Sequence, residues 1–349
     1  MSAMKVGMGI AYAQGGFRET VEKLVELEEV GLDAVSVAEL YSFDAVSQLG
    51  YIAARTSRVH IESGIVQIYT RTPSLTAMTA AGLDYVSDGR FVLGMGASGP
   101  QVIEGFHGLK YDAPVGRTRE IVEICRQVWR REKVQYSGKH YTVPLPPEQG
   151  TGLGKPLKLI NHPVRAQIPV MLAALGPKNV ELAAELAEVW EPIWFHPGRA
   201  HEVWGAALEA GKAKRDPALG ELRTSVNVPF AVGPGAGKLR EQVRPQLALY
   251  VGGMGAKGKN FYNDLAARYG FADEAAEIQD LYLSGQKDAA AEKVPEELVH
   301  AVSLIGTEDE VAEQVREFAA AGVTQLNIQP LEPDHDTVKS SLETLKSLL

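Results

Sequence analysis

Residues 58–89, RVHIESGIVQIYTRTPSLTAMTAAGLDYVSDG, contain the unit from which the fold is predicted. The first part, residues 58–68, is short and rich in Ile and Val, as in a buried strand. Residues 73–89 form a longer segment that starts with Pro73, which the first turn of a helix tolerates because its missing N–H needs no partner there. A glycine, Gly64, interrupts the apolar run of the strand. The segment therefore predicts an irregular strand followed by a helix.

The strand–helix pair recurs along the whole chain. Apolar segments of strand length occur eight times, and each is followed by a segment with helical spacing. The predicted strands are residues 4–12, 33–40, 58–68, 90–98, 168–175, 190–197, 223–233 and 325–331. Strands that alternate with helices pair in parallel through right-handed crossovers. Eight units, with the last strand near the C-terminus, predict an α/β fold of the (β/α)8 TIM-barrel type; a doubly wound sheet built from the same units is the alternative.

Two segments break this alternation. Residues 133–166 follow the fourth strand and its helix, and they contain a predicted hairpin and a loop rich in Pro and Gly. Residues 238–305 follow the seventh strand and are predicted to be mostly helical. We interpret residues 1–349 as a single domain with these two insertions. The active site of such a barrel lies at the carboxyl ends of its strands, and the insertions could roof that face.

The composition is that of a globular chain with a net charge of −9, from 35 Lys and Arg against 44 Asp and Glu. An acidic chain does not suit the phosphate backbone, so no nucleic-acid partner is expected. No apolar run reaches the roughly 18 residues of a membrane span, and the first residues lack the pattern of a signal peptide. The one cysteine, Cys125, cannot form an internal disulfide. These features predict a cytoplasmic protein without a membrane span.

Two predicted strands end in residues that suit a ligand site. Glu39 comes directly after the second strand, where a carboxylate can act as a general acid or base; a solvated loop acid is the alternative. Gly94, Gly96 and Gly99 come at the end of the fourth strand. The dinucleotide fingerprint requires a helix that opens at once, but Pro100 follows instead. We therefore predict a tight turn where the backbone approaches a flat ligand, with a simple bulge as the alternative.

The segment after the fifth strand predicts an anion site. Residues 173–179, AALGPKN, lead into a helix with Pro177 in its first turn. The free N–H groups and the dipole of a helix N-terminus attract phosphate, and Lys178 adds a positive charge. A well-capped turn without a ligand is the alternative.

Aromatic residues gather at the sixth predicted strand, where they form either a pocket or part of the barrel wall. They are Trp190, Trp194 and Phe195, followed by His196. The histidines show no spacing typical of a zinc site, so no metal is expected.

Taken together, the segments at the strand ends resemble the luciferase-like flavin and deazaflavin oxidoreductase superfamily. More narrowly, they resemble its branch that uses coenzyme F420, an 8-hydroxy-5-deazaflavin with a phosphate-bearing tail. The matching segments are VAEL (37–40), SGIVQIYTRTP (63–73), GRFVLGMGASGPQVIEGF (89–106) and IPVMLAALGPKNVELAAELAE (168–188). The resemblance runs the whole length and includes GTGLGKPLK (150–158) and LALYVGGMG (247–255) in the insertions.

The resemblance implies how a cofactor would be held. Relatives carry a non-prolyl cis peptide in a bulge behind the ring, and the matching bond is Gly64–Ile65; an ordinary glycine bulge is the alternative. By position, the residues near the ring would be Glu39, Gly64, Ile65, Val66, Met95 and Gly96. The residues holding the tail phosphate would be Leu175, Gly176, Pro177, Lys178 and Asn179.

The resemblance also implies an enzyme that transfers hydride between the deazaflavin and a small substrate. Leu40 and Ala97 stand where sugar-phosphate dehydrogenases of this branch carry His and Glu, so glucose-6-phosphate is not expected. An apolar carbonyl, alcohol or activated alkene suits the aromatic residues Phe106, Trp194, Phe195 and Phe261. Glu39 or His107 would exchange the accompanying proton. Because relatives are often dimers, a homodimer is expected.

Three other functions remain open at this point. The same fold could bind FMN and act as an oxygen-dependent monooxygenase, with the phosphate turn serving a shorter tail. A barrel aldolase or isomerase would want a buried Schiff-base lysine at a strand end, and none is found. A non-catalytic carrier of the deazaflavin would bind it without turnover.

Overall fold

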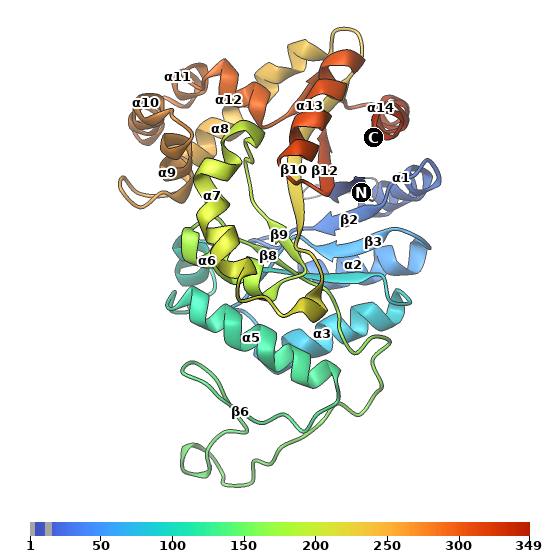
Figure 1. Cartoon of the computed structure of the whole chain (residues 1–349), viewed down its shortest axis with the longest axis vertical. Coiled ribbons are helices and arrows are strands. Elements are labelled where there is room, and N and C mark those ends of the chain that lie inside the picture. The colour runs from blue at the N-terminus through green and yellow to red at the C-terminus, as the bar shows by residue number, and fades with distance from the viewer. Residues whose placement is uncertain (1–3, 11–15) are drawn as a thin grey trace.

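The computed structural model describes residues 4–10 and 16–349 and shows a closed barrel of parallel strands (Figure 1). The ring closes because β12 pairs with β1 and β9 pairs with β10. In ring order the strands are β1 (Lys5–Ile10), β2 (Ala34–Val37), β3 (His60–Ser63), β5 (Phe91–Gly96), β8 (Val170–Ala173), β9 (Val189–Glu191), β10 (Arg223–Val232) and β12 (Gln325–Pro330). The predicted TIM barrel is confirmed, and the closed ring rules out a doubly wound sheet. Residues 11 and 12 of the first predicted strand lie outside the described residues.

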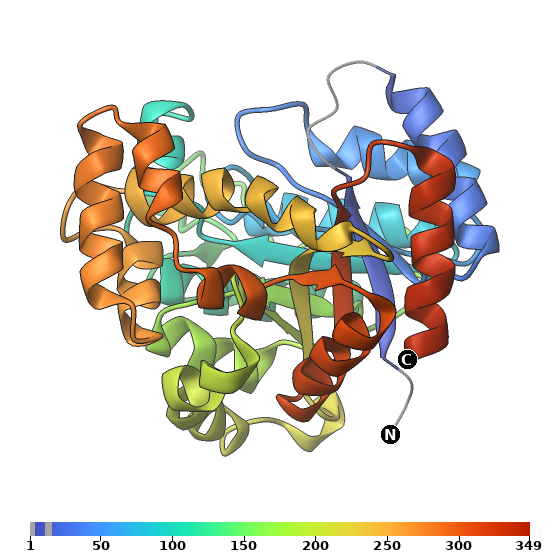
Figure 2. The same ribbon diagram turned by 90° about the horizontal axis from the view of Figure 1, so that it is seen from above.

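In the described part of the chain, a long helix covers the outside of the barrel after each of these strands (Figures 1 and 2). The helices are α1 (Phe17–Glu29), α2 (Ala45–Arg55), α3 (Pro73–Val86), α5 (Pro114–Trp129), α6 (Pro177–Leu186), α7 (Pro197–Lys212), α13 (Glu308–Ala320) and α14 (His335–Leu348). Side chains fix several starting points: Asp44 and Thr72 cap α2 and α3, and Thr307 forms a capping box with Glu310. The main apolar core lies between the strands and these helices. Among the described residues, no helix combines the length and apolar character that a membrane crossing needs.

The third strand is interrupted, unlike the continuous strand predicted for residues 58–68. Both β3 and β4 (Val66–Gln67) pair with β5, but Glu62 lies opposite Val92 whereas Val66 lies opposite Met95. The third strand therefore holds one residue more than its partner between these two pairs, which defines a β-bulge. The Gly64–Ile65 bond within the bulge is cis, as the resemblance implied.

Ser63 replaces the ladder hydrogen bonds that the bulge removes. Its hydroxyl donates to the carbonyl of Gly94 (2.9 Å) and accepts from the N–H of Gly94 (2.8 Å). Gly94 and Gly96 therefore lie within β5 rather than in the predicted turn. The short helix α4 (Pro100–Gly105) opens directly after Gly99, so the prediction that Pro100 prevents a helix here is wrong. Proline fits because it occupies the first helical turn.

The first insertion packs along the outside of the barrel. It contains the predicted hairpin as β6 (Tyr136–Ser137) and β7 (Thr142–Val143). The carboxylate of Glu120 on α5 accepts hydrogen bonds from the backbone of residues 139–141. Near its end, Arg165 forms an ion pair with the buried Asp84 of α3. Because α3 and α5 hold this segment, it does not roof the mouth, and that expectation is wrong for it.

The second insertion stands beside the carboxyl ends of the strands and is mostly helical, as predicted. Its elements are η3 (Ala236–Gln242), α8 (Arg244–Ala248), the π-helix η4 (Leu249–Gly253), α9 (Phe261–Arg268), α10 (Ala272–Leu283), α11 (Lys287–Glu292) and α12 (Glu296–Ala301). Tyr269 donates a hydrogen bond to the carbonyl of Trp194 (2.9 Å), just past the end of β9. Figure 2 shows α9, α10 and α11, in orange, grouped at one side of the barrel, whereas the gold segment with η3 and α8 runs across the view. The end of the segment runs into β11 (Leu304–Gly306), which pairs with β10 and was not predicted.

Candidate active site at the barrel mouth

Polar side chains fill much of the barrel interior, where such barrels usually carry branched apolar residues. Gln325 donates hydrogen bonds through its Nε2 to Glu62 Oε2 (3.0 Å) and Asn327 Oδ1 (2.9 Å). Asn327 in turn donates to Ser225 Oγ (2.9 Å). The network thus joins β3, β10 and β12 across the interior. A small apolar cluster, separate from the main core, consists of Val92, Met171 and Val189.

Small residues form the floor of the mouth above this network. Gly9, Ala173 and Asn227 come from three strands of the ring and Gly64 from the bulge between β3 and β4, and each is half-buried. Side chains in a fully packed barrel would be buried, so this exposure shows that the mouth is open to their depth. Gly96 lies beside Ala173 but is buried, because the side chain of Ile65 packs against it: a Cβ at Gly96 would lie 3.1 Å from Ile65 Cδ1 and 3.4 Å from Ala173 Cβ. The result is a floor with few bulky side chains.

Two carboxyl groups lie in this interior, and sequence reasoning missed both. Burial raises the pKa of Glu62 to about 7, although the hydrogen bond from Gln325 acts to lower it. Burial also raises the pKa of Glu191 to about 7, and the nearby charge of Glu62 adds to that shift. Neither carboxylate forms an ion pair with another described residue. Their neutral and charged forms are therefore close in free energy near neutral pH.

We expect the free energy of unfolding to fall as the pH rises from about 4.5 to about 7. The pKa of each carboxyl is raised above its ordinary value of 4.5, so the folded chain keeps protons that the unfolded chain has released. This stabilisation is complete below about pH 4.5 and is lost as the pH passes about 7. Each shift corresponds to on the order of 3 kcal/mol before the coupling between the groups is counted. Urea unfolding at about pH 5 and about pH 8 measures it.

Glu62→Gln is the matched variant for this measurement. It removes the titrating group with little change of shape, so it should be more stable than the wild type near pH 8 and equal to it near pH 5. His60 titrates in the opposite sense, because burial, Lys5 and Arg223 lower its pKa to about 4. The quantity to compare at each pH is therefore the difference in free energy of unfolding between the variant and the wild type. A difference that stays constant across this range would contradict the prediction.

Glu39 forms a buried ion pair beside the bulge. Its carboxylate accepts hydrogen bonds from Arg71 Nη1 (2.6 Å) and Nη2 (2.9 Å), and also from the N–H of Ala45 (3.0 Å). The side chain of Gln67 donates to the carbonyl of Glu39 (2.8 Å), and the N–H of Glu39 donates to Ile65 (3.2 Å). These bonds fix the loop after β2 against the bulge. Since both carboxylate oxygens are engaged, the arrangement favours a structural role for Glu39 over proton exchange.

The predicted ring-lining residues of the third and fourth strands lie together but do not all face the mouth. Val66 and Met95 pair in register, and both side chains are buried in the core between strands and helices. Only their backbones can therefore contribute to the mouth. Gly64 and Ile65 are half-buried at the mouth side of the same strands and are available to a ligand, whereas Gly96 is buried beneath the side chain of Ile65.

The start of α6 offers free backbone donors at the mouth. Gly176 is the N-cap residue, and no side chain caps the helix. Lys178 and Pro177 are exposed in the first turn. The preceding loop is held from behind, because the indole N–H of Trp204 donates to the carbonyl of Leu175 (2.9 Å). An uncapped N-terminus with an adjacent cation suits an anion.

His107 lies apart from these residues, two positions after the end of α4. Its ring packs edge-on against Phe106, and Phe106 contacts Tyr41 of the loop after β2. The Nε2 atom of His107 is buried without a hydrogen-bond partner. The structure therefore places His107 at the rim of the mouth, and its role in proton exchange stays a prediction.

Aromatic residues of the second insertion form one wall beside the end of β9. Trp194 packs edge-on against Tyr250, which packs edge-on against Tyr262. The backbone of Trp194 has a left-handed φ of 51°, which is uncommon for a bulky residue. Phe195 points the other way, outside the barrel. Its ring stacks on that of Trp204, with the two ring centroids 5.8 Å apart. The expectation that Phe195 lines the substrate site is therefore wrong, whereas Trp194 adjoins this wall.

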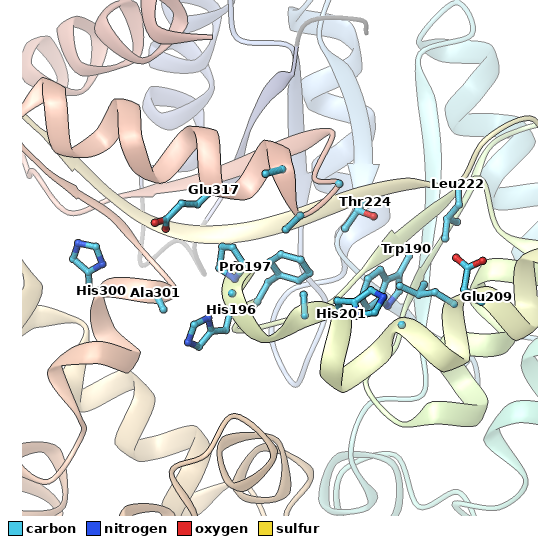
Figure 3. A pocket seen from close by; sticks show the side chains of 18 of the residues that line it. Trp190, His196, Pro197, His201, Glu209, Leu222, Thr224, His300, Ala301 and Glu317 are labelled. Atoms are coloured by element: carbon cyan, nitrogen blue, oxygen red, sulfur yellow. The ribbon is translucent and has the colours of Figure 1, made fainter.

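A cavity of about 1100 Å³ lies outside the barrel between α7, α12 and α13 (Figure 3). Trp190, Phe195 and His196 line part of it, and Glu297 and Glu317 stand at its edge. None of the residues predicted for cofactor binding or catalysis lines this groove. It is therefore separate from the mouth.

The comparison with family models decides the assignment. The model described as luciferase-like monooxygenase matches residues 1–325. The chain belongs to this family. Luciferase-like monooxygenases are enzymes, so the chain is an enzyme, and the recognition of the family from the strand ends is confirmed.

Relatives within the luciferase-like family cover nearly the whole chain. A protein of Mycobacterium tuberculosis (strain ATCC 25618 / H37Rv) named "Putative coenzyme F420-dependent oxidoreductase Rv3520c" is 40% identical, over 93% of this chain and 94% of its own length. A 5,10-methylenetetrahydromethanopterin reductase of Archaeoglobus fulgidus is 29% identical, over 88% of each chain. The structure of the coenzyme F420-dependent tetrahydromethanopterin reductase from Methanopyrus kandleri matches with a TM-score of 0.80 at 22% identity, covering 100% of this chain and 99% of the other.

Proposed function

We propose that the chain is a coenzyme F420-dependent oxidoreductase that transfers hydride between the deazaflavin and a small apolar carbonyl, alcohol or activated alkene. The observation that carries the proposal is the shape of the mouth. A flat tricyclic ring would fit a floor made of Gly9, Gly64 and Ala173, and a phosphate would fit the uncapped start of α6. The name of the relative that is 40% identical supports this coenzyme.

The chain's own residues would bind and orient the coenzyme. When bound, the deazaflavin supplies a carbon that gives or accepts hydride. Gly64 and Ile65 would support the ring from behind, with the backbones of Val66 and Met95 alongside and Gly96 below. Glu39 would act through Arg71, by holding the loop after β2 against the bulge. The residues that would hold the phosphate are Leu175, Gly176, Pro177, Lys178 and Asn179.

Exposed aromatic residues around the mouth support an apolar substrate. Tyr41 and Phe43 lie on the loop after β2, Phe106 follows α4, and Phe261 begins α9. All four side chains are exposed, and Tyr41 and Phe106 are in ring contact. Such a rim would favour an apolar molecule over a sugar phosphate, because it offers apolar surface and few cations.

Cofactor titration tests this proposal. We expect the purified chain to bind coenzyme F420 more tightly than FMN and to reduce or oxidise it with enones, ketones or secondary alcohols without oxygen. Lys178→Ala should weaken coenzyme binding about tenfold, equivalent to about 1.4 kcal/mol, and the loss should shrink at high salt. Lys158→Ala, at an exposed position in the first insertion, is the control with unchanged binding.

FMN remains the alternative cofactor, because the same helix start would serve its phosphate. Tighter binding of FMN with oxygen-dependent product would replace the proposal by a monooxygenase. Binding of coenzyme F420 without turnover on any screened substrate would favour a carrier.

The assembly and location of the chain stay predictions. We expect a homodimer that acts in the cytoplasm on a small molecule, without nucleic acid or membrane. Light scattering on the purified protein measures its mass in solution.

A further inference from the structure

Glu191 is the carboxyl group that the structure places at the floor of the mouth. It is the last residue of β9 and lies opposite Ala173 of β8 in register. Its Oε1 accepts a hydrogen bond from Asn227 Nδ2 (3.1 Å) on β10. Both Ala173 and Asn227 are half-buried, so the opening of the mouth extends to the residues that flank this carboxyl.

The carboxyl of Glu191 has no evident structural task. A buried carboxylate is unfavourable unless a cation or several hydrogen bonds compensate it. Within the described residues, Glu191 has one side-chain hydrogen bond, from a neutral amide, and no ion pair. A group of this kind at the carboxyl end of a barrel strand is in the position where such barrels carry their chemistry.

We propose that Glu191 carries the proton that enters or leaves the substrate during hydride transfer, and that Asn227 positions its carboxyl group for this exchange. The inference rests on the proposed function. In the oxidising direction the C–H bond of an alcohol breaks and its electron pair leaves with the hydrogen to the deazaflavin, the oxidant. The O–H bond breaks, its proton passes to the carboxylate of Glu191, and a carbonyl forms. In the reducing direction the carboxylic acid of Glu191 returns the proton.

The surrounding charges suit a proton that moves near neutral pH. Burial raises the pKa of Glu191, the charge of Glu62 raises it further, and the amide of Asn227 opposes both. Arg223 on β10 and Lys5 on β1 face Glu62 and lower its pKa, against burial. Because the two carboxyls interact, they titrate as a pair, and the first proton lost belongs to both.

The two residues predicted from the sequence suit this task less well. Glu39 has both oxygens engaged by Arg71, and one of them also accepts from the N–H of Ala45, so neither is free to meet a substrate. His107 lies at the rim, beyond α4, with its Nε2 buried away from solvent. Glu191 combines a position at the floor with a carboxyl that no cation holds in its charged form.

The test combines infrared spectra of the coenzyme-free chain with a count of the protons exchanged when oxidised coenzyme F420 binds. We expect the wild type to keep a protonated carboxyl band above about pH 6, where ordinary carboxyls are ionised. We expect its proton count on binding to change with pH around neutrality. Glu191→Gln should lose part of the band and reduce the pH dependence of the count to what Glu62 and the coenzyme contribute, whereas Glu191→Asp should retain a second titrating carboxyl.

Glu188→Gln is the matched control, because Glu188 directly precedes β9, at the other end of that strand. Its carboxylate accepts from the N–H of Val170 (2.8 Å) and pairs with Arg126 (3.4 Å), away from the mouth. The Glu188→Gln variant should show the same carboxyl band and the same proton count as the wild type. Once a substrate is known, Glu191→Gln should lower turnover about 10²–10⁴-fold and remove a limb of the pH profile.

Two failures are distinguishable. If wild type and Glu191→Gln bind the coenzyme with the same pH-dependent proton count, the assignment of Glu191 is overturned while the proposed function stands. If the wild type does not bind the coenzyme at all, the proposed function is overturned, and the catalytic role of Glu191 with it. Absence of a protonated carboxyl band in the wild type also overturns the assignment.

Discussion

Gly94→Ala is expected to prevent the barrel from folding stably. An added Cβ at this position would lie 1.7 Å from the carbonyl oxygen of Ser63 and 2.8 Å from Cε of Met171. The methionine can move, but the oxygen belongs to backbone that the bulge holds in place. Overpacking by one methyl usually costs about 1–3 kcal/mol, and a backbone clash exceeds that range. The free energy of unfolding of a native protein is only about 5–15 kcal/mol. A loss of this size would therefore leave much of the protein unfolded.

Gly50→Ala is the control for this prediction. Gly50 lies within α2, and nothing lies within 4 Å of a Cβ added there. Alanine should stabilise the helix by about 0.5–1 kcal/mol. Circular dichroism melts of both variants measure the contrast. A Gly94→Ala variant that melts near the wild-type temperature would show that the third strand can move away from β5.

Arg71→Ala is expected to cost about 3–5 kcal/mol of stability, because it leaves the carboxylate of Glu39 buried without its cation. The two side chains are only 14% and 9% exposed. The loop after β2 should loosen as well, since Glu39 also holds the N–H of Ala45. Denaturant unfolding measures the loss, and coenzyme titration of the folded fraction measures the effect on the mouth.

A double-mutant cycle and an exposed pair control this experiment. Adding Glu39→Gln to Arg71→Ala removes the unpaired charge and should restore part of the stability. Lys23→Ala breaks the pair between Lys23 and Glu19, which are 46% and 68% exposed. That change should cost less than about 1 kcal/mol. If Arg71→Ala costs no more than Lys23→Ala, the buried pair does not hold the mouth together.

The fold was predictable from the sequence because each unit contains a short apolar segment typical of a strand, followed by a segment with helical spacing. Local patterns do not show where an insertion packs, however. The first insertion looked like a roof for the mouth, but long-range contacts made by Glu120 and Arg165 hold it on α5 and α3. The three-residue β11 escaped prediction because so short a segment has no detectable period.

The site residues that follow a predicted strand could be located from the sequence. Those that lie buried within a predicted strand could not. Residues 175–179 follow a strand and lead into a helix, so the pattern located them. Glu62 and Glu191 lie inside predicted strands, where a polar residue in the sequence does not reveal which partners it meets. Only the closure of the ring brings their carboxyls into one interior.

The extra residue in the third strand also reverses the alternation of side chains along it. Ser63 and Val66 both face the layer of α2 and α3, where a regular strand would send them to opposite sides. Saturation mutagenesis of residues 60–68 should therefore show a phase change: tolerance would alternate up to Ser63 and resume out of step from Val66. A one-residue deletion between them would make the strand regular and leave Ser63 and Val66 on the helix side, but it would remove the bulge that presents Gly64 and Ile65 at the mouth, so loop-shortening designs should spare this position.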